Sequence, residues 1–130
     1  AFRALQESRL KLIIGVAIAW VLGAFLEELL LRGIVLSIIQ AALTWPLGAM
    51  AASIVGIFVA AAIAFALHLY QGLRAAIIIA QLSVLFGALF VVSGHNLWSV
   101  ILAHGFYDTI AFIRFANKQS KYSNLDAAAQ

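Results

Sequence analysis

The sequence predicts an all-α polytopic membrane protein, a bundle of about four transmembrane helices. Of its 130 residues, 65% are hydrophobic and 10% are charged, and its mean hydropathy is +1.08, which is not the composition of a soluble domain. Residues 33–73 and 75–107 contain no charged side chain, and each stretch is longer than the roughly 20 residues that cross a bilayer once. Each stretch must therefore contain a turn.

Composition also excludes some classes of protein. The chain has no cysteine, so it has no disulfide framework, no Cys-ligated zinc site and no thiol nucleophile. Its formal net charge is +3, but the eight Lys and Arg residues are mostly spread along the flanks of the predicted helices. Nucleic-acid binding needs a basic stripe on a water-facing surface, so we expect no nucleic-acid partner.

The first predicted helix covers residues 10–43. It ends before Trp45-Pro46, because proline cannot continue a helical hydrogen-bond ladder and disfavours helical geometry in the residue before it. About 34 residues at about 1.5 Å each make roughly 50 Å, against about 30 Å of hydrocarbon in a bilayer. We therefore expect this helix to tilt, to bend near Gly23 or Gly33, or to project beyond the membrane.

The second predicted helix covers residues 47–70 and ends at Gln71-Gly72. Small residues recur along it at every fourth position, and such a stripe lets a neighbouring helix approach closely. The stripe consists of Gly48, Ala52, Gly56, Ala60 and Ala64. His68 follows in the same register, where this packing surface ends.

The third and fourth predicted helices cover residues 74–93 and 96–117, with Gly94 in the turn between them. All four are expected to be α-helical, because backbone polar groups in lipid must be satisfied within their own segment. Residues 1–117 then form a single transmembrane helical domain. Residues 118–130 form a polar C-terminal tail, which we expect to be loosely ordered.

Charge placement predicts that both ends of the chain are cytoplasmic. Short cytoplasmic loops carry an excess of Lys and Arg. With four crossings and a cytoplasmic N-terminus, seven of the eight Lys and Arg residues fall on the cytoplasmic side. These seven are Arg3, Arg9, Lys11, Arg74, Arg114, Lys118 and Lys121. Arg32 is left inside the membrane.

Six ionisable residues lie at membrane depth in the predicted helices. They are Glu27, Glu28, Arg32, His68, His104 and Asp108. A charged group at the centre of a membrane helix costs at least about 2.5–3.5 kcal/mol on insertion scales. So many in a small bundle require a structural or functional reason.

The glutamate pair on the first helix suggests acid-base chemistry. Glu28 and Arg32 are four residues apart and can pair along one helix face, whereas Glu27 points about 100° away from that face. Two adjacent carboxylates in a low-dielectric site do not both ionise easily, so one could act as a general base while the other holds the arginine. The alternative is an internal ion pair that fixes the helix register.

The histidines add to this pattern only in combination. His104 and Asp108 are four residues apart, so the carboxylate can orient the imidazole ring. A single histidine in a bundle is more often structural than catalytic, and His95 in the outer turn is an ordinary interface histidine on this interpretation. With the double glutamate, three helices supply water-activating and charge-stabilising groups. The predicted boundaries place His68 near the inner end of its helix, and Glu27 and His104 nearer the middle of theirs.

These residues resemble the motifs of the CAAX-protease and bacteriocin-processing (CPBP, Rce1-like) family of intramembrane endopeptidases. The family's first motif, two glutamates, three residues and an arginine, is matched by Glu27-Glu28-Leu29-Leu30-Leu31-Arg32. Its last motif, His-x-x-x-Asn or a similar residue, is matched by His104-Gly105-Phe106-Tyr107-Asp108. The resemblance covers residues 20–112 of the chain.

The resemblance implies an intramembrane endopeptidase that hydrolyses a peptide bond with a glutamate-activated water. In that family, the residue at Glu27 would activate the water together with the histidine at His68. Glu28 and Arg32 would position the site. No cofactor is required by this mechanism. The implied location is the cytoplasmic (inner) membrane of a bacterium, with membrane lipids and a membrane protein or peptide substrate as partners.

The resemblance also assigns His104 and Asp108 to stabilisation of the oxyanion that forms when water adds to the scissile carbonyl. Two positions depart from the family pattern. Ala64 stands where the second motif usually has phenylalanine, with Phe65 one residue later, and Asp108 stands in place of asparagine. An ionised aspartate has no hydrogen to donate to an oxyanion, although it can orient His104.

Three other hypotheses remain open. The same hydrolysis could use zinc, since Glu, His and Asp are zinc ligands, although the chain has no His-Glu-x-x-His motif. The chain could instead be a non-catalytic membrane subunit that retains the protease scaffold and binds partner transmembrane helices. A proton-coupled transporter is less favoured, because four crossings without an internal repeat rarely form an alternating-access pathway.

Overall fold

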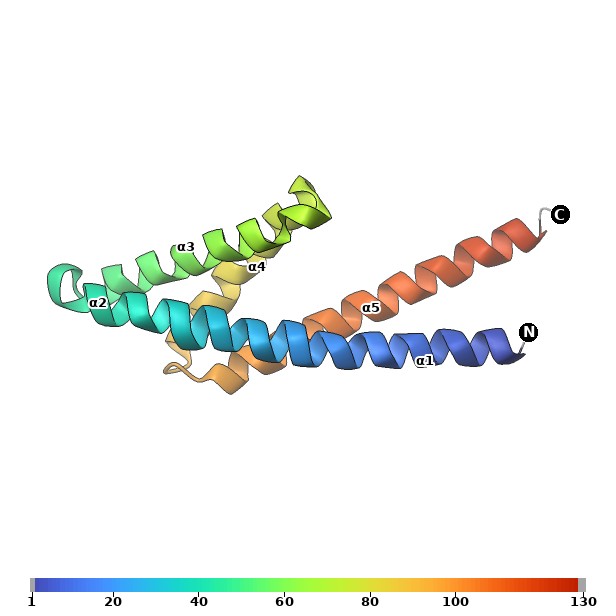
Figure 1. Cartoon of the computed structure of the whole chain (residues 1–130), viewed down its shortest axis with the longest axis horizontal. Helices are drawn as coiled ribbons and strands as arrows, with labels where there is room; N and C mark the ends of the chain where they lie inside the picture. The colour runs from blue at the N-terminus through green and yellow to red at the C-terminus, as the bar shows by residue number, and fades with distance from the viewer. Residues whose placement is uncertain (1, 129–130) are drawn as a thin grey trace.

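The computed structural model describes residues 2–128, and the elements in this range are helices joined by short turns (Figure 1). Four helical segments follow one another as one long rod that begins at the N-terminus. They are α1 (Phe2–Ile18), η1 (Ala19–Glu27), η2 (Leu29–Leu36) and α2 (Ser37–Leu47). The structure confirms the all-α prediction.

The middle of the rod is π-helical. In π geometry each backbone N–H bonds to the carbonyl five residues earlier, and such turns are rare and frequently found at functional sites. Segments η1 and η2 flank Glu28 and contain Gly23 and Gly33, the two glycines at which a bend was expected. Figure 1 shows no sharp break at this part of the rod. At these two glycines the first helix therefore changes its hydrogen-bond pattern and does not bend sharply.

The first helix does not stop at the predicted proline. Helix α2 includes Pro46 and ends at Leu47, and the chain then turns at Gly48, whose φ is +81°. The Gly48 N–H still donates to the Thr44 carbonyl at 2.9 Å. A proline near the end of a helix removes one hydrogen bond, whereas a positive φ favours glycine strongly, so the glycine decides where this helix ends.

Helices α3 (Ala49–His68) and α4 (Leu73–Val92) return alongside the rod, joined by the short 3-10 segment η3 (Leu69–Gln71). Helix α3 packs mainly against α2 and α4. The small-residue stripe faces these neighbours, since Ala52, Gly56, Ala60 and Ala64 are all buried. A Cβ added to Gly56 would lie 3.3 Å from Leu36 on the rod. The predicted packing role of the stripe is confirmed for these four residues, but it was wrong for Gly48, which is exposed in the turn before α3.

Helix α5 (Leu97–Ala128) turns back along the N-terminal half of the rod and packs mainly against η1. Figure 1 shows the start of α1 and the end of α5 at the same end of the molecule. The helix continues through residues 118–128, so the expectation of a loosely ordered tail was wrong over that range. These residues contain no glycine or proline and include several good helix formers, which explains the continuation.

Within residues 2–128, three helices are long and apolar enough to cross a membrane, with α5 as a fourth helix beside them. The three spans are Arg9–Leu47, Ala49–Gln71 and Leu73–Val92. The chain is therefore a polytopic integral membrane protein. Helices α2, α3 and α4 pack as one group, and α1, η1 and α5 pack as another, with η2 between them.

Candidate active site

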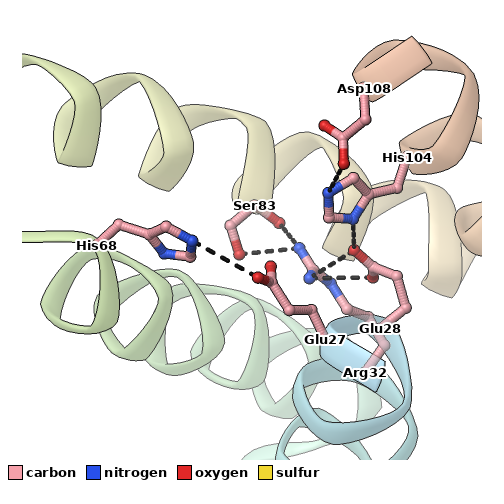
Figure 2. Close-up of polar contacts among 7 residues, drawn as sticks. All are labelled: Glu27, Glu28, Arg32, His68, Ser83, His104 and Asp108. Carbon is pink, nitrogen blue, oxygen red and sulfur yellow. Dashed lines mark hydrogen bonds and ion pairs between the residues drawn. The ribbon is translucent and has the colours of Figure 1, made fainter. Parts of the chain in front are cut away.

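A cavity of about 340 Å³ lies where these two helix groups meet. It is lined by all six ionisable residues that the sequence placed at membrane depth, together with apolar side chains from α4 and α5. Figure 2 shows how the helices contribute to it. The rod supplies the two glutamates and the arginine, α3 supplies one histidine, and α5 supplies the other histidine and the aspartate.

Glu28 is the buried centre of the cluster. Its side chain is 0% exposed, and Arg32 Nη1 donates to its Oε1 at 3.1 Å and lies 3.0 Å from its Oε2. From α5, His104 Nδ1 lies 2.6 Å from the same Oε1. A carboxylate held between a guanidinium and an imidazole is electrostatically satisfied inside the membrane domain. Glu28 therefore ties the rod to α5.

Arg32 connects the rod to α4 through a residue that the sequence did not predict. Its Nη2 donates to the backbone carbonyl of Ser83 at 2.6 Å and to the Ser83 hydroxyl at 2.8 Å. The guanidinium also lies 5.8 Å from the ring centroid of Phe86. A lone serine in an apolar helix gives no signal in the sequence, because most such hydroxyls bond within their own helix.

His104 has a carboxylate facing each of its ring nitrogens. Nδ1 faces Glu28, and Nε2 lies 3.5 Å from Asp108 Oδ2. The Phe86 ring stacks on the imidazole, with the ring centroids 5.0 Å apart. A Cβ added to Gly23 would lie 3.1 Å from Asp108 Oδ2, so a glycine at this point of η1 gives the aspartate its space.

Glu27 and His68 form the more open side of the cavity. Their Oε1 and Nε2 atoms are 3.5 Å apart, and their side chains are 32% and 13% exposed. His68 Nδ1 lies 2.8 Å from the Ala64 carbonyl, which can only accept, so Nδ1 carries a proton. The Nε2 atom is therefore the one directed toward Glu27. At this spacing a water molecule can contact both side chains.

The expected difference in depth between His68 and Glu27 is absent. The rod and α3 run antiparallel from the turn at Gly48, and Glu27 precedes Gly48 by 21 residues while His68 follows it by 20. The two residues therefore lie opposite each other. The rod is more than twice as long as α3, so a residue near the middle of the rod lies opposite the end of α3.

His95 is absent from the lining of this cavity. It stands in the turn before α5 with a φ of +64°, and its Nε2 lies 2.9 Å from Gln40 Oε1. The Gln40 amide in turn donates to the Ser53 hydroxyl at 2.6 Å. These residues line a second, mostly apolar cavity of about 700 Å³ beside the Gly48 turn.

Within the described residues, no three or more His, Cys, Asp or Glu side chains are grouped so that they could hold a metal ion. The cluster instead pairs acids with bases. Two carboxylates, Glu27 and Asp108, each lie beside one histidine, and the third carboxylate is shared by Arg32 and His104. Such a set can take a proton from a water, return it, and place N–H donors near a developing negative charge.

Comparison with known proteins gives one match. The family model described as Type II CAAX prenyl endopeptidase Rce1-like matches residues 9–110, which is most of the chain and contains all six residues of the cluster. No curated protein and no solved structure shows significant similarity to the chain.

Proposed function

The chain belongs to the Rce1-like type II CAAX prenyl endopeptidase family, and from this premise we propose that Glu27 activates a water molecule for peptide-bond hydrolysis. At the level of the family, the protein is an intramembrane endopeptidase. The observation that carries the finer proposal is the Glu27–His68 pair. It is partly exposed to the cavity, and its facing atoms are 3.5 Å apart, within reach of one shared water.

The proposed reaction begins with a water that sits beside the Glu27–His68 pair and contacts both side chains. Glu27 takes a proton from the water as the water oxygen attacks the scissile carbonyl carbon, and the electron pair of the C=O bond moves onto the carbonyl oxygen. Glu27 then gives the proton to the amide nitrogen, the C–N bond breaks, and the amine leaves. The carbonyl re-forms in a new C-terminal carboxyl group.

His104 is the proposed stabiliser of the oxyanion. Its Nδ1 side is held by the buried Glu28, so the ring is fixed with Nε2 on the Asp108 side of the cavity. An N–H donor held in advance at the place where negative charge develops lowers the barrier without further reorganisation. Arg32 takes no direct part in this proposal; its Nη1 and Nη2 atoms donate to Glu28 and Ser83 and so help to hold Glu28 in place.

Cleavage of a synthetic peptide tests the proposal. The probes are a farnesylated CAAX peptide, chosen from the family's name, and the same peptide without the prenyl group. Purified protein in detergent is incubated with each probe, and fragments are identified by mass spectrometry. Glu27→Gln should lower the rate by at least about 100-fold, as expected for loss of a general base. Equal cleavage by the variant and the parent would overturn the proposed role.

A zinc-dependent version of the reaction is tested on the same preparation. Metal analysis of the purified protein should give substoichiometric zinc, and activity should survive a chelator. One zinc per chain, with activity lost on chelation and restored by zinc, would replace the glutamate mechanism with a metal mechanism.

One observation favours a second function, that of a non-catalytic subunit binding partner transmembrane helices. Asp108 places a carboxylate, which has no hydrogen to donate when ionised, beside the nitrogen of His104 that would serve the oxyanion. This function predicts no cleavage of either probe by the parent protein. It also predicts purification in a complex of fixed stoichiometry that Glu27→Gln leaves intact.

We further propose that both termini are cytoplasmic and that the membrane is a bacterial inner membrane. The chain has no native cysteine, so single-cysteine variants report sidedness cleanly. In intact bacterial cells with a permeable outer membrane, Asn96→Cys should react with a membrane-impermeant maleimide. Ser120→Cys should react only after lysis. The reverse pattern would place the termini outside.

A further inference from the structure

The hydroxyl of Ser83 accepts a hydrogen bond from a charged side chain of another helix. Thr44, Ser53 and Thr109 each donate to the carbonyl four residues earlier in their own helix, at 2.6 to 2.8 Å. Such local bonds satisfy the hydrogen of each hydroxyl. Ser53 and Thr109 also accept across helices, from the neutral side chains of Gln40 and Trp20. The buried Ser83 hydroxyl accepts from the Arg32 guanidinium on the rod. Its contact therefore joins two helices at the cavity.

Ser83 fixes the plane of the Arg32 guanidinium. Two acceptors from one residue, the carbonyl at 2.6 Å and the hydroxyl at 2.8 Å, converge on Nη2. The guanidinium is planar and rigid, so fixing Nη2 also fixes the direction in which Nη1 points. Nη1 faces the Glu28 carboxylate, at 3.0 and 3.1 Å from its two oxygens. The orientation of Glu28 is thus set from α4.

These contacts form a continuous chain from α4 to α5. Ser83 holds Arg32, Arg32 holds Glu28, and Glu28 Oε1 holds His104 Nδ1 at 2.6 Å. Figure 2 shows the chain as a line of dashed contacts leading away from Ser83. We propose that Ser83 is a positioning residue for hydrolysis, which acts through Arg32 and Glu28 to set the orientation of the His104 ring. This inference rests on the proposed function.

Kinetics of four variants test the positioning role. Ser83→Ala and Ser83→Cys both remove the strong hydroxyl acceptor, and the second nearly keeps the side-chain volume. Both should lower kcat about tenfold and leave KM within twofold, the loss expected when a buried donor in a site loses one partner. Ser83→Thr keeps the hydroxyl and should recover most of kcat. Ser93→Ala removes a hydroxyl that bonds only to Phe90 nearby, and should match the parent.

Folding is not expected to limit this experiment, because the Ser83 carbonyl still accepts from Arg32 in each variant. Two kinetic results would overturn the proposal. One is a kcat for Ser83→Cys within twofold of the parent. The other is a fall in kcat in Ser83→Thr as large as the fall in Ser83→Ala, which would assign the effect to side-chain packing.

A spectroscopic arm separates this inference from the proposed function. The chain has three histidines, so ¹⁵N-histidine labelling gives few ring signals, and a His104→Gln variant assigns one of them. Ser83→Ala should shift the His104 ring signals and leave those of His95 unchanged, whether or not the protein cleaves a peptide. Unshifted His104 signals would overturn the chain of contacts. Shifted signals in a protein that cleaves neither probe would retain the positioning chain and reject the protease function.

Discussion

Glu27 and Glu28 are adjacent in the sequence, yet they face two different sides of the same cavity. Glu28 is fully buried, and its carboxylate is shared by Arg32 and His104 at distances of 2.6 to 3.1 Å. Glu27 is one-third exposed, and its nearest basic atom, in His68, is 3.5 Å away. The Glu28 side is closed and closely paired, with only Glu28 Oε2 and Arg32 Nε lacking a hydrogen-bond partner among its described residues, whereas the Glu27 side is open and loosely paired.

The difference shows how one helix can give two identical side chains different capacities. Successive side chains on a helix point in different directions, which here turns Glu28 toward α5 and Glu27 toward His68 on α3. A carboxylate that already accepts from a guanidinium and an imidazole is poorly placed to accept a further proton. A carboxylate with room for water beside it can do so. We therefore expect substitutions of Glu28 to lower mainly the unfolding free energy, and substitutions of Glu27 to lower mainly the rate of peptide hydrolysis.

The largest expected effect is on stability, from Glu28→Ala. Removing this carboxylate leaves the buried Arg32 charge without its partner, and breaking a buried ion pair in this way costs about 3–5 kcal/mol of unfolding free energy. Glu27→Ala, the matched variant one residue earlier, should cost less than about 1 kcal/mol. Unfolding in mixed micelles measures both. Equal losses of unfolding free energy in the two variants would mean that the Glu28 side of the cavity is no more tightly paired than the Glu27 side.

The next effect concerns chemistry on the open side. His68→Ala should lower kcat by about 100-fold with little change in stability, because His68 helps to hold and polarise the water. His95→Ala removes a histidine from outside the cavity and should leave kcat within twofold of the parent. Peptide-cleavage rates and thermal unfolding are measured for both variants. If both lose the same activity, the cavity is not the reacting site.

A smaller effect is expected where α5 crosses the rod. A Cβ at Gly105 would lie 2.6 Å from the Trp20 ring, and that ring's N–H also donates to Thr109 on α5. Gly105→Ala should therefore push α5 away and cost about 1–3 kcal/mol, as overpacking does. Gly33→Ala is the control, because its Cβ would meet Leu29 at an ordinary 3.4 Å. The unfolding free energies of the two variants are compared. A Gly105→Ala variant as stable as the parent would refute the close crossing of α5 and the rod.

Much of the fold could be predicted from the sequence, since apolar runs and turn residues mark the helices. Gly72 and Gly94 lie in turns within a residue or two of the predicted positions. The end of the first helix was misplaced by the weight given to Pro46. The π-helical segments could not be predicted, because no residue pattern distinguishes them from ordinary helix. The continuation of α5 depends on helix propensity, which hydropathy does not reveal.

The cavity residues could be predicted only in part. Ionisable residues at membrane depth are conspicuous, and all six line one cavity. Their contacts were less predictable: the spacing of four residues indicated the Glu28–Arg32 pair, but the Glu28–His104 contact joins residues 76 positions apart. Ser83 gave no sequence signal at all, because its role depends on where α4 lies against the rod. Their roles in hydrolysis stay predictions until the variants are measured.

The smallest expected effect, and the only expected increase in kcat, comes from Asp108→Asn. In the parent, His104 lies between a carboxylate that is fully buried and a second one that is 24% exposed. The side-chain amide of asparagine has the shape of the Asp108 carboxylate but carries no charge, and its NH₂ group can donate a hydrogen bond to an oxyanion. We therefore expect kcat to rise by about threefold, with unfolding unchanged. A fall in kcat would mean that the negative charge of Asp108 is needed to hold His104, and that both sides of this imidazole are part of the closed, paired half of the site.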